Sequence, residues 1–209
     1  MHEEVGEIFR GLVPADRSDG FPEFFVVLLR ELAKGRPVAP SALAAKLDWP
    51  LKRVTAVLAQ VSSTEYAGEA IVGYGLTLRE TPHSFEVDGH HLHTWCALDA
   101  LMFPALIGKS ARVASRCAAT GVPISLVAAP DEVRDIEPAG AVVSLVRLSR
   151  ASDLRSAFCC HVHFFASATS ASAWISKHEG AVVVSVEEAF WLGQELVRRL
   201  SAGEESRPS

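Results

Sequence analysis

Apolar residues recur at helical spacing in three stretches near the start of the chain. Residues 21–34 form the first and stop at Gly35, a residue that often ends a helix. Residues 41–48 form a short second stretch, for which we expect Ser41 to be the N-cap. After Trp49-Pro50, residues 51–61 place their apolar side chains on one stripe. Three helices with a tight middle turn suggest a helix-turn-helix.

Two stretches that follow change to the alternation typical of strands. Residues 71–80 and 83–95 alternate between apolar and polar side chains and are connected through Thr81-Pro82. We interpret them as a hairpin, the wing of a winged-helix-like unit. The pattern therefore predicts an N-terminal winged-helix-like unit over residues 1–80.

Winged helices often bind DNA. The alternative is that this unit serves only as a packing element. Nucleic-acid binding depends on several cations that contact phosphates. The candidate recognition helix offers only Lys52 and Arg53, and the whole chain has a formal net charge of −5. We expect no nucleic-acid partner.

The second half of the chain is dominated by short strand-like runs. Residues 94–108 form a helical stretch that ends at Gly108, and residues 171–178 and 186–200 predict two further helices. Strand-like runs separated by Gly and Pro turns are found at residues 111–117, 122–129, 141–148, 159–167 and 181–186. We predict an α+β protein in which a mixed β-sheet with flanking helices forms a catalytic domain over residues 81–209.

Composition agrees with a folded chain of ordinary kind. The 209 residues are 49% hydrophobic and 22% charged, enough to bury a sizeable core. The N-terminus is acidic and lacks the apolar core of a signal peptide. The longest apolar run, residues 24–29, is closed by Arg30 and is far shorter than a membrane span. We expect a cytoplasmic protein with no membrane partner.

Four cysteines carry the most informative chemistry. They are Cys96, Cys117, Cys159 and Cys160. A reducing compartment and their irregular spacing argue against disulfides. Such thiols serve as buried filler, as metal ligands or as nucleophiles.

The first candidate site is the sequence WCALD. Cys96 and Asp99 are three residues apart, so on a helix they share a face. The segment follows a strand and begins a helix, where the helix dipole favours an anion, so we expect a lowered thiol pKa for Cys96. The alternative is that Cys96 is a buried small hydrophobe and Asp99 an ordinary acid of the first turn.

The second candidate site is the sequence FCCHVH. If it is a strand, Cys159, His161 and His163 point to one side and Cys160 to the other. A structural zinc site would normally show paired ligands such as C-x2-C, and dithiol redox exchange would favour C-x-x-C; neither pattern is present. Two thiolates suit a soft, two-coordinate cation, and a nearby carboxylate can accept and return a proton.

Several longer runs resemble one known family. These are LLRELAKGRPV, LDWP, STEY, GYGLTLRET, WCALDALMFPALIG, CAATG, EPAG and FCCHVHFFAS, with SKHEG and GQE near the end. Together they resemble the organomercurial lyase (alkylmercury lyase) family of bacterial mercury resistance over residues 21–200. The resemblance implies protonolysis of a carbon–mercury bond, which gives a hydrocarbon and Hg(II) and so detoxifies the substrate.

The resemblance also assigns roles to individual residues. Cys96 and Cys159 match the two catalytic, mercury-binding cysteines, and Asp99 matches the family's carboxylate, which also helps to hold the product Hg(II). Cys117 matches a structural cysteine, and Cys160 matches a neighbour that is not essential. No organic cofactor or resident metal is expected, because mercury arrives with the substrate. The resemblance also implies that external small thiols release the product and that Hg(II) passes transiently to mercuric reductase.

Two other functional classes use the same residues. In a metal-responsive winged-helix regulator the cysteines would sense the metal and the helices would bind DNA. In a mercury scavenger the same ligands would bind mercury without turnover. Product formation separates the enzyme from both.

Overall fold

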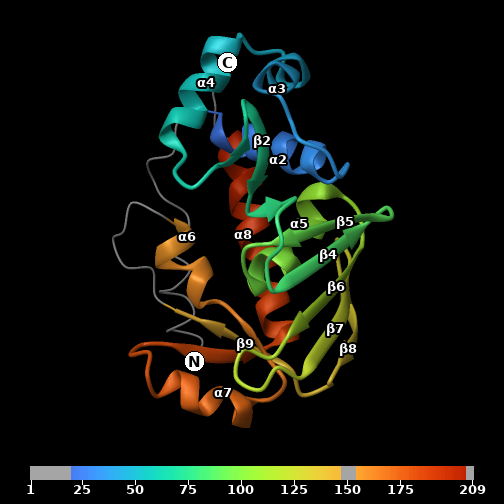
Figure 1. Cartoon of the computed structure of the whole chain (residues 1–209), viewed down its shortest axis with the longest axis vertical. Helices are drawn as coiled ribbons and strands as arrows, with labels where there is room; N and C mark the ends of the chain where they lie inside the picture. The colour runs from blue at the N-terminus through green and yellow to red at the C-terminus, as the bar shows by residue number, and fades with distance from the viewer. Residues whose placement is uncertain (1–19, 147–153, 206–209) are drawn as a thin grey trace.

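The computed structural model describes residues 20–146 and 154–205. Within these described residues, seven α-helices lie around two antiparallel sheets (Figure 1), so the α+β class is confirmed. The helices are α2 (Phe21–Leu32), α3 (Pro40–Leu47), α4 (Leu51–Gln60), α5 (Ala97–Ile107), α6 (Leu154–Ala157), α7 (Ala168–Ile175) and α8 (Val186–Glu205). A short 3-10 helix, η1, spans Cys159–His161.

The large sheet has eight strands in the order β1-β2-β3-β5-β4-β6-β7-β8, and the small sheet has three in the order β10-β9-β11. In chain order the strands are β1 (Glu65–Ala67), β2 (Ala70–Tyr74), β3 (Leu76–Thr77), β4 (His83–Val87), β5 (His90–Thr94), β6 (Ala111–Arg116), β7 (Pro123–Ala128), β8 (Val133–Glu137), β9 (Val142–Leu145), β10 (Phe164–Phe165) and β11 (Val182–Ser185). Every described strand pair is antiparallel, so the expected mixed sheet is wrong. Most neighbouring strands are joined by short turns, which can connect only antiparallel strands.

The first three predicted helices are confirmed, with one change at a terminus. The apolar stripe of α2 is buried, as its spacing predicts. Helix α3 begins at Pro40 with Ala39 as the N-cap, so the expected N-cap Ser41 is wrong. Proline suits the first turn of a helix because its φ is already helical and its missing N–H has no partner there.

The predicted hairpin through Thr81-Pro82 is wrong. Strand β2 instead turns into β3 at Gly75, and β4 pairs with β5 across Asp88-Gly89. Asp88 and Gly89 have φ of 51° and 76°, which suits a two-residue hairpin turn. Gly75 has φ 73°, and an added Cβ would lie 2.6 Å from the ring of Phe103.

Strand β3 pairs with β5, so the large sheet continues without a break past residue 80. One hydrophobic core extends from Phe21 to Leu196 and includes residues from both sides of that position. The division at residue 80 and the winged-helix-like character of the first part stay predictions.

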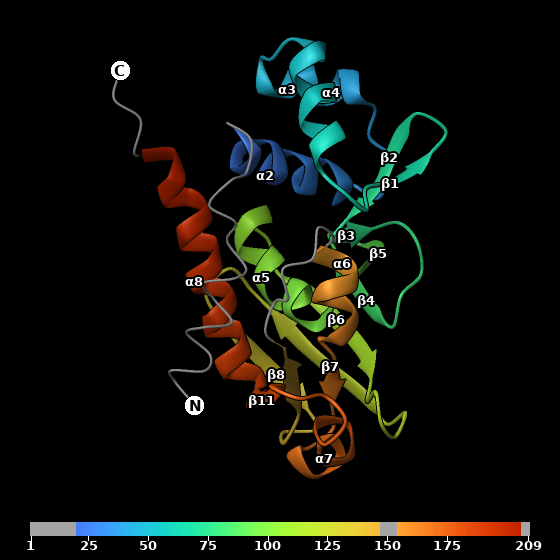
Figure 2. The ribbon, with the colours of Figure 1, turned by 90° about the vertical axis from the view of Figure 1, so that its left-hand side faces the viewer.

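The centre of the molecule is α5, which lies between α8 and the large sheet (Figures 1 and 2). Nearly all its side chains are buried, and Gly108 ends it with φ 79° as expected. Gly193 of α8 packs so tightly against α5 that an added Cβ would lie 2.8 Å from Cβ of Met102. The middle of α5 is therefore packed closely against α8.

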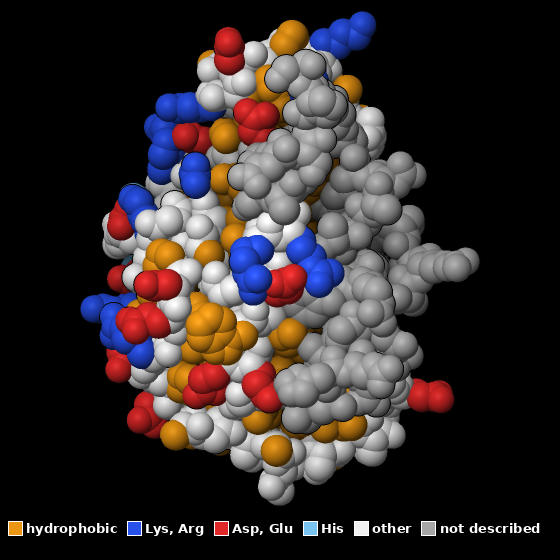
Figure 3. Space-filling model, turned by 180° about the vertical axis from the view of Figure 1, so that it is seen from behind, with side chains coloured by type: hydrophobic (Ala, Val, Ile, Leu, Met, Phe, Trp, Pro, Cys, Tyr) orange, Lys and Arg blue, Asp and Glu red, His pale blue; other side chains and the backbone are white. Residues whose placement is uncertain are grey.

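On the face seen in Figure 3, the described basic and acidic side chains are interspersed rather than gathered by sign. Within the described segments we find no helix with both the length and the apolar character to cross a bilayer.

Candidate active site

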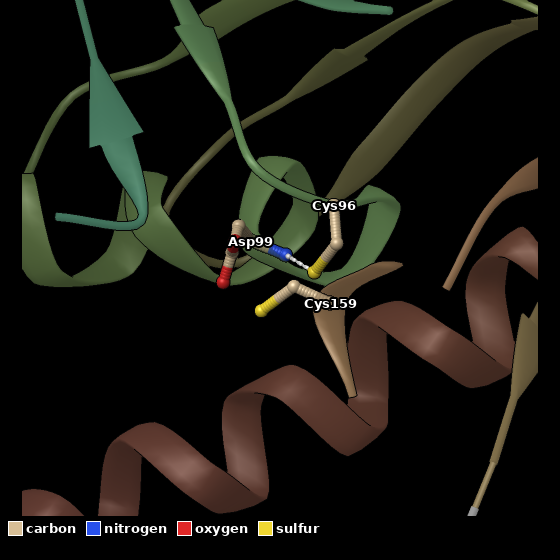
Figure 4. A group of neighbouring side chains, drawn as sticks. All are labelled: Cys96, Asp99 and Cys159. Atoms are coloured by element: carbon tan, nitrogen blue, oxygen red, sulfur yellow. Dashed lines mark hydrogen bonds between the residues drawn. The ribbon is translucent and has the colours of Figure 1, made fainter. Parts of the chain in front are cut away.

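Cys96 lies at the junction of β5 and α5. It is the N-cap of α5, with extended backbone angles, and its Sγ accepts a hydrogen bond of 3.4 Å from the N–H of Asp99 (Figure 4). The first N–H groups of a helix lack partners within it, so an N-cap side chain that accepts a hydrogen bond is favoured. The cap explains why the spacing of three residues brings Cys96 and Asp99 together.

Cys159 comes from a separate segment and does not lie on a strand. Residues Cys159–His161 form η1, so the strand predicted for FCCHVH is wrong there. Successive side chains of a 3-10 helix point about 120° apart. Cys159 is accordingly buried while Cys160 is exposed. The predicted separation of the two neighbours holds, but its cause is a helical turn and not strand parity.

The backbone that carries Cys159 is held from two sides. The N–H of Ala97 donates to the carbonyl of Val162 at 3.1 Å, which ties this segment to the start of α5. Ser144 of β9 donates its hydroxyl to the carbonyl of His161 at 2.8 Å and accepts from the N–H of His163 at 2.9 Å. The role of Ser144 was not predicted, although a serine inside the apolar run AVVSLV is a recognisable signal.

Cys96, Asp99 and Cys159 meet in one place. One ligand atom from each lies within 4.8 Å of the others, and the three side chains point toward one another (Figure 4). Among the described residues, no other group of three or more His, Cys, Asp or Glu side chains is arranged to hold a metal ion.

The remaining candidates do not join this cluster. Strand parity grouped His161 and His163 with Cys159, and this grouping is wrong. The ring of His161 lies 5.8 Å from that of His178, and the ring of His163 lies 6.0 Å from that of Trp174. His163 therefore contacts α7, and His161 contacts a residue just after α7.

Cys117 also lies outside the cluster. It is 2% exposed and follows β6. Burial raises its pKa, but hydrogen bonds with Thr120, Ser170 and the backbone outweigh burial and lower the pKa to about 7. Its structural role stays a prediction.

Burial controls the protonation of the site. It raises the pKa of Cys96 well above the usual thiol value, and the hydrogen bond with Cys159 and the charge of Asp99 raise it further. The expected lowering of the pKa at the helix N-terminus is therefore wrong, because desolvation outweighs the bond from the Asp99 N–H. For Cys159 the hydrogen bond with Cys96 lowers the pKa, but burial and neighbouring negative charge together raise it.

Asp99 is also shifted toward its neutral form. Burial raises its pKa from 3.8 to about 7, against two hydrogen bonds with Cys96 that lower it. Its Oδ2 is buried and has no hydrogen-bond partner among the described residues. The resting site thus combines two thiols with a carboxyl group that titrates near neutral pH.

Replacing Asp99 by asparagine is expected to weaken the dependence of stability on pH. Folded Asp99 keeps its proton up to about pH 7, whereas an unfolded aspartate loses it near about pH 4. Between these values the folded state binds more protons, so the free energy of unfolding of the wild type falls as pH rises. Asparagine has no such proton to lose.

Thermal unfolding of both proteins from pH 4 to pH 8 measures this effect. The melting temperature of Asp99→Asn should rise relative to wild type across this range, while Asp88→Asn at an exposed turn should show no such trend. Parallel curves for Asp99→Asn and wild type would contradict the raised pKa.

Comparison with known proteins agrees with this geometry. The family model for alkylmercury lyase (MerB) matches residues 76–198. An alkylmercury lyase of Pseudomonas putida is 53% identical over 195 residues, which cover 93% of this chain and 92% of that protein. An alkylmercury lyase of Staphylococcus epidermidis is 47% identical over 186 residues, which cover 88% of this chain and 85% of the relative.

A solved structure shows the same fold. The crystal structure of the mercury-bound form of MerB2 superposes with a TM-score of 0.79 at 23% identity and covers 95% of this chain and 99% of that one. With the close relatives and the family model, this leads to one conclusion. The chain belongs to the alkylmercury lyase family.

Proposed function

We propose that Cys96, Asp99 and Cys159 carry out the reaction of this alkylmercury lyase, the protonolysis of a carbon–mercury bond. The observation that supports the proposal is the meeting of two thiols and one carboxyl group, with ligand atoms within 4.8 Å of one another. Soft sulfur ligands select soft metal ions such as mercury, and the carboxyl group provides a proton donor beside them.

Mercury binding removes the thiol protons. The substrate is R–Hg–X, in which X is a small thiolate that accompanies the organomercurial cation. As one cysteine forms its S–Hg bond, X leaves and takes up that thiol proton as X–H. Although burial raises the pKa of both thiols, a cation that coordinates a thiol deprotonates it. The second cysteine then binds mercury and gives its proton to the Asp99 carboxylate.

Proton transfer to carbon completes the reaction. The second sulfur pushes electron density onto the carbon attached to mercury and makes that carbon more basic. Asp99, which burial makes a stronger base than an ordinary aspartate, now carries the proton from the second cysteine and delivers it to this carbon. The C–Hg bond breaks, R–H leaves, and Hg(II) remains between the two sulfurs beside the Asp99 carboxylate. The balance is R–Hg–X plus two thiols giving R–H, X–H and a mercury dithiolate.

The same residues supply everything that the reaction needs, so we propose that no organic cofactor or resident metal takes part. Cys96 and Cys159 are 1% and 4% exposed, so release of Hg(II) requires ligand exchange with small external thiols. Mercuric reductase is the proposed recipient. All four cysteines are free thiols, which suits the reducing cytoplasm in which we place the protein.

Detection of hydrocarbon tests the function. Purified protein incubated with methylmercury and excess small thiol is expected to release methane well above a protein-free control. Retention of mercury with no methane would instead indicate a scavenger and would contradict the proposal.

A further inference from the structure

One side chain links the two segments that carry the reactive cysteines. Arg155 belongs to α6, four residues before Cys159. Its guanidinium carbon lies 4.5 Å from the centre of the Trp95 ring, and Trp95 directly precedes Cys96. A guanidinium over an indole face is an attractive cation–π contact. Arg155 therefore connects the two segments that must bring their sulfurs to one mercury ion.

Arg155 is itself held by the first part of the large sheet. Its Nη1 lies 2.5 Å from Oε1 of Glu65 at the start of β1. The Glu65 side chain is 6% exposed, whereas that of Arg155 is 36% exposed. A carboxylate buried to this degree is costly unless it is paired. The pair therefore restrains the position of the arginine.

Glu65 is held in place from its other side. Thr77 of β3 donates its hydroxyl to Oε2 of Glu65. The strand register places Glu65 opposite Gly73, and Gly73 opposite Thr77, in one row across three strands. An added Cβ at Gly73 would overlap both side chains. The glycine thus makes room for the bond, which leaves Oε1 of Glu65 facing Arg155.

We propose that Arg155 is a positioning residue, a clamp through which β1–β3 fixes the Cys159 segment relative to Cys96. The inference rests on the proposed function. Both sulfurs must reach the same ion for the C–Hg bond to be activated, and a misplacement of about 1 Å can cost about 100-fold in rate. The clamp gives strands β1–β3 a role in the reaction although none of their side chains belongs to the reactive cluster.

Steady-state kinetics of hydrocarbon release tests the clamp. The variants are Arg155→Gln, Arg155→Lys, Glu65→Gln and the double variant Glu65→Gln/Arg155→Gln, with the exposed Arg112→Gln as a matched control. We expect Arg155→Gln and Glu65→Gln to lower kcat by about 10- to 100-fold. KM should change little, because binding through one sulfur is retained.

Two further readouts separate positioning from stability alone. Arg155→Lys should recover part of kcat, since it keeps the charge. The double variant should be no slower than the worse single variant, because both changes break one connection. Assays are run well below the melting temperature of each variant. Values of kcat within twofold of wild type for both single variants, or fully additive losses in the double variant, would overturn the clamp.

A second measurement does not depend on turnover. Hg(II) is titrated into each protein in competition with a small dithiol. The clamp predicts that Arg155→Gln retains Hg(II) at least about tenfold less tightly than wild type and Arg112→Gln, because two misplaced sulfurs chelate poorly. Equal retention would overturn the clamp. Failure of the proposed function would look different, since wild type itself would then release no hydrocarbon.

Discussion

Replacing Cys159 by serine is expected to lower kcat/KM for protonolysis by at least about 1,000-fold, equivalent to about 4 kcal/mol of transition-state stabilisation. The serine hydroxyl is a hard ligand that keeps its proton at neutral pH, so it cannot supply the second soft ligand to mercury. The same change at Cys160 should leave kcat/KM within about twofold of wild type, because surface substitutions are usually mild. Cys159 is buried beside Cys96 and Asp99, whereas its neighbour is exposed.

The two variants form a matched pair, with the same chemical change at adjacent residues of η1. Methane or benzene release from methylmercury or phenylmercury gives the rates, and thermal unfolding confirms that each variant is folded. An active Cys159→Ser together with an inactive Cys160→Ser would reverse the assignment. Cys96→Ala should also abolish turnover.

The part of the site that sequence predicts well is the part made by local structure. Cys96 and Asp99 lie on one helical turn, so their meeting depends only on where α5 begins. That start is encoded locally, by a strand that ends and an apolar helical stretch that follows it. The pKa of Cys96 could not be predicted in the same way, because it depends on burial by distant segments.

Cys159 shows the opposite situation. The run CCHVHFF has the composition of a strand, but only Phe164–Phe165 forms one. The preceding residues take a helical turn because Ser144 and Ala97 bind their backbone groups. These contacts come from other segments, which override local propensity. The Glu65–Arg155 pair, 90 residues apart in sequence, has no local signal at all.

The two differences between the predicted and the observed strands have separate origins. Asp88-Gly89 carries a stronger hairpin signal than Thr81-Pro82, because Asp-Gly suits a two-residue turn between antiparallel strands. Strand β8 was not predicted, since its mostly exposed and polar sequence VRDIE shows no apolar alternation and Asp135 within it has φ 56°. It forms because the edge of β7 offers free backbone groups for pairing.

Replacing Asp99 by asparagine is expected to separate mercury binding from bond cleavage. Asparagine has nearly the same shape but no carboxyl proton to give to carbon, so turnover should fall by about 100- to 10,000-fold, the usual contribution of a general acid. Both sulfurs remain, so the variant should still bind the organomercurial in a one-to-one complex. The matched control is Asp88→Asn, the same change at an exposed turn.

A single-turnover experiment distinguishes the two steps. Phenylmercury is mixed rapidly with an excess of protein. The loss of free thiols reports binding, and the release of benzene reports cleavage. In wild type the benzene signal should follow binding closely, and in Asp99→Asn thiol loss should persist while benzene lags far behind. Benzene release at the wild-type rate would mean that the proton reaches carbon from another donor. Loss of binding and cleavage together would mean that Asp99 acts mainly as a mercury ligand. Only persistent thiol loss with delayed benzene release in Asp99→Asn assigns the carboxyl of Asp99 as the proton donor of the reaction. Burial holds that carboxyl near its titration point.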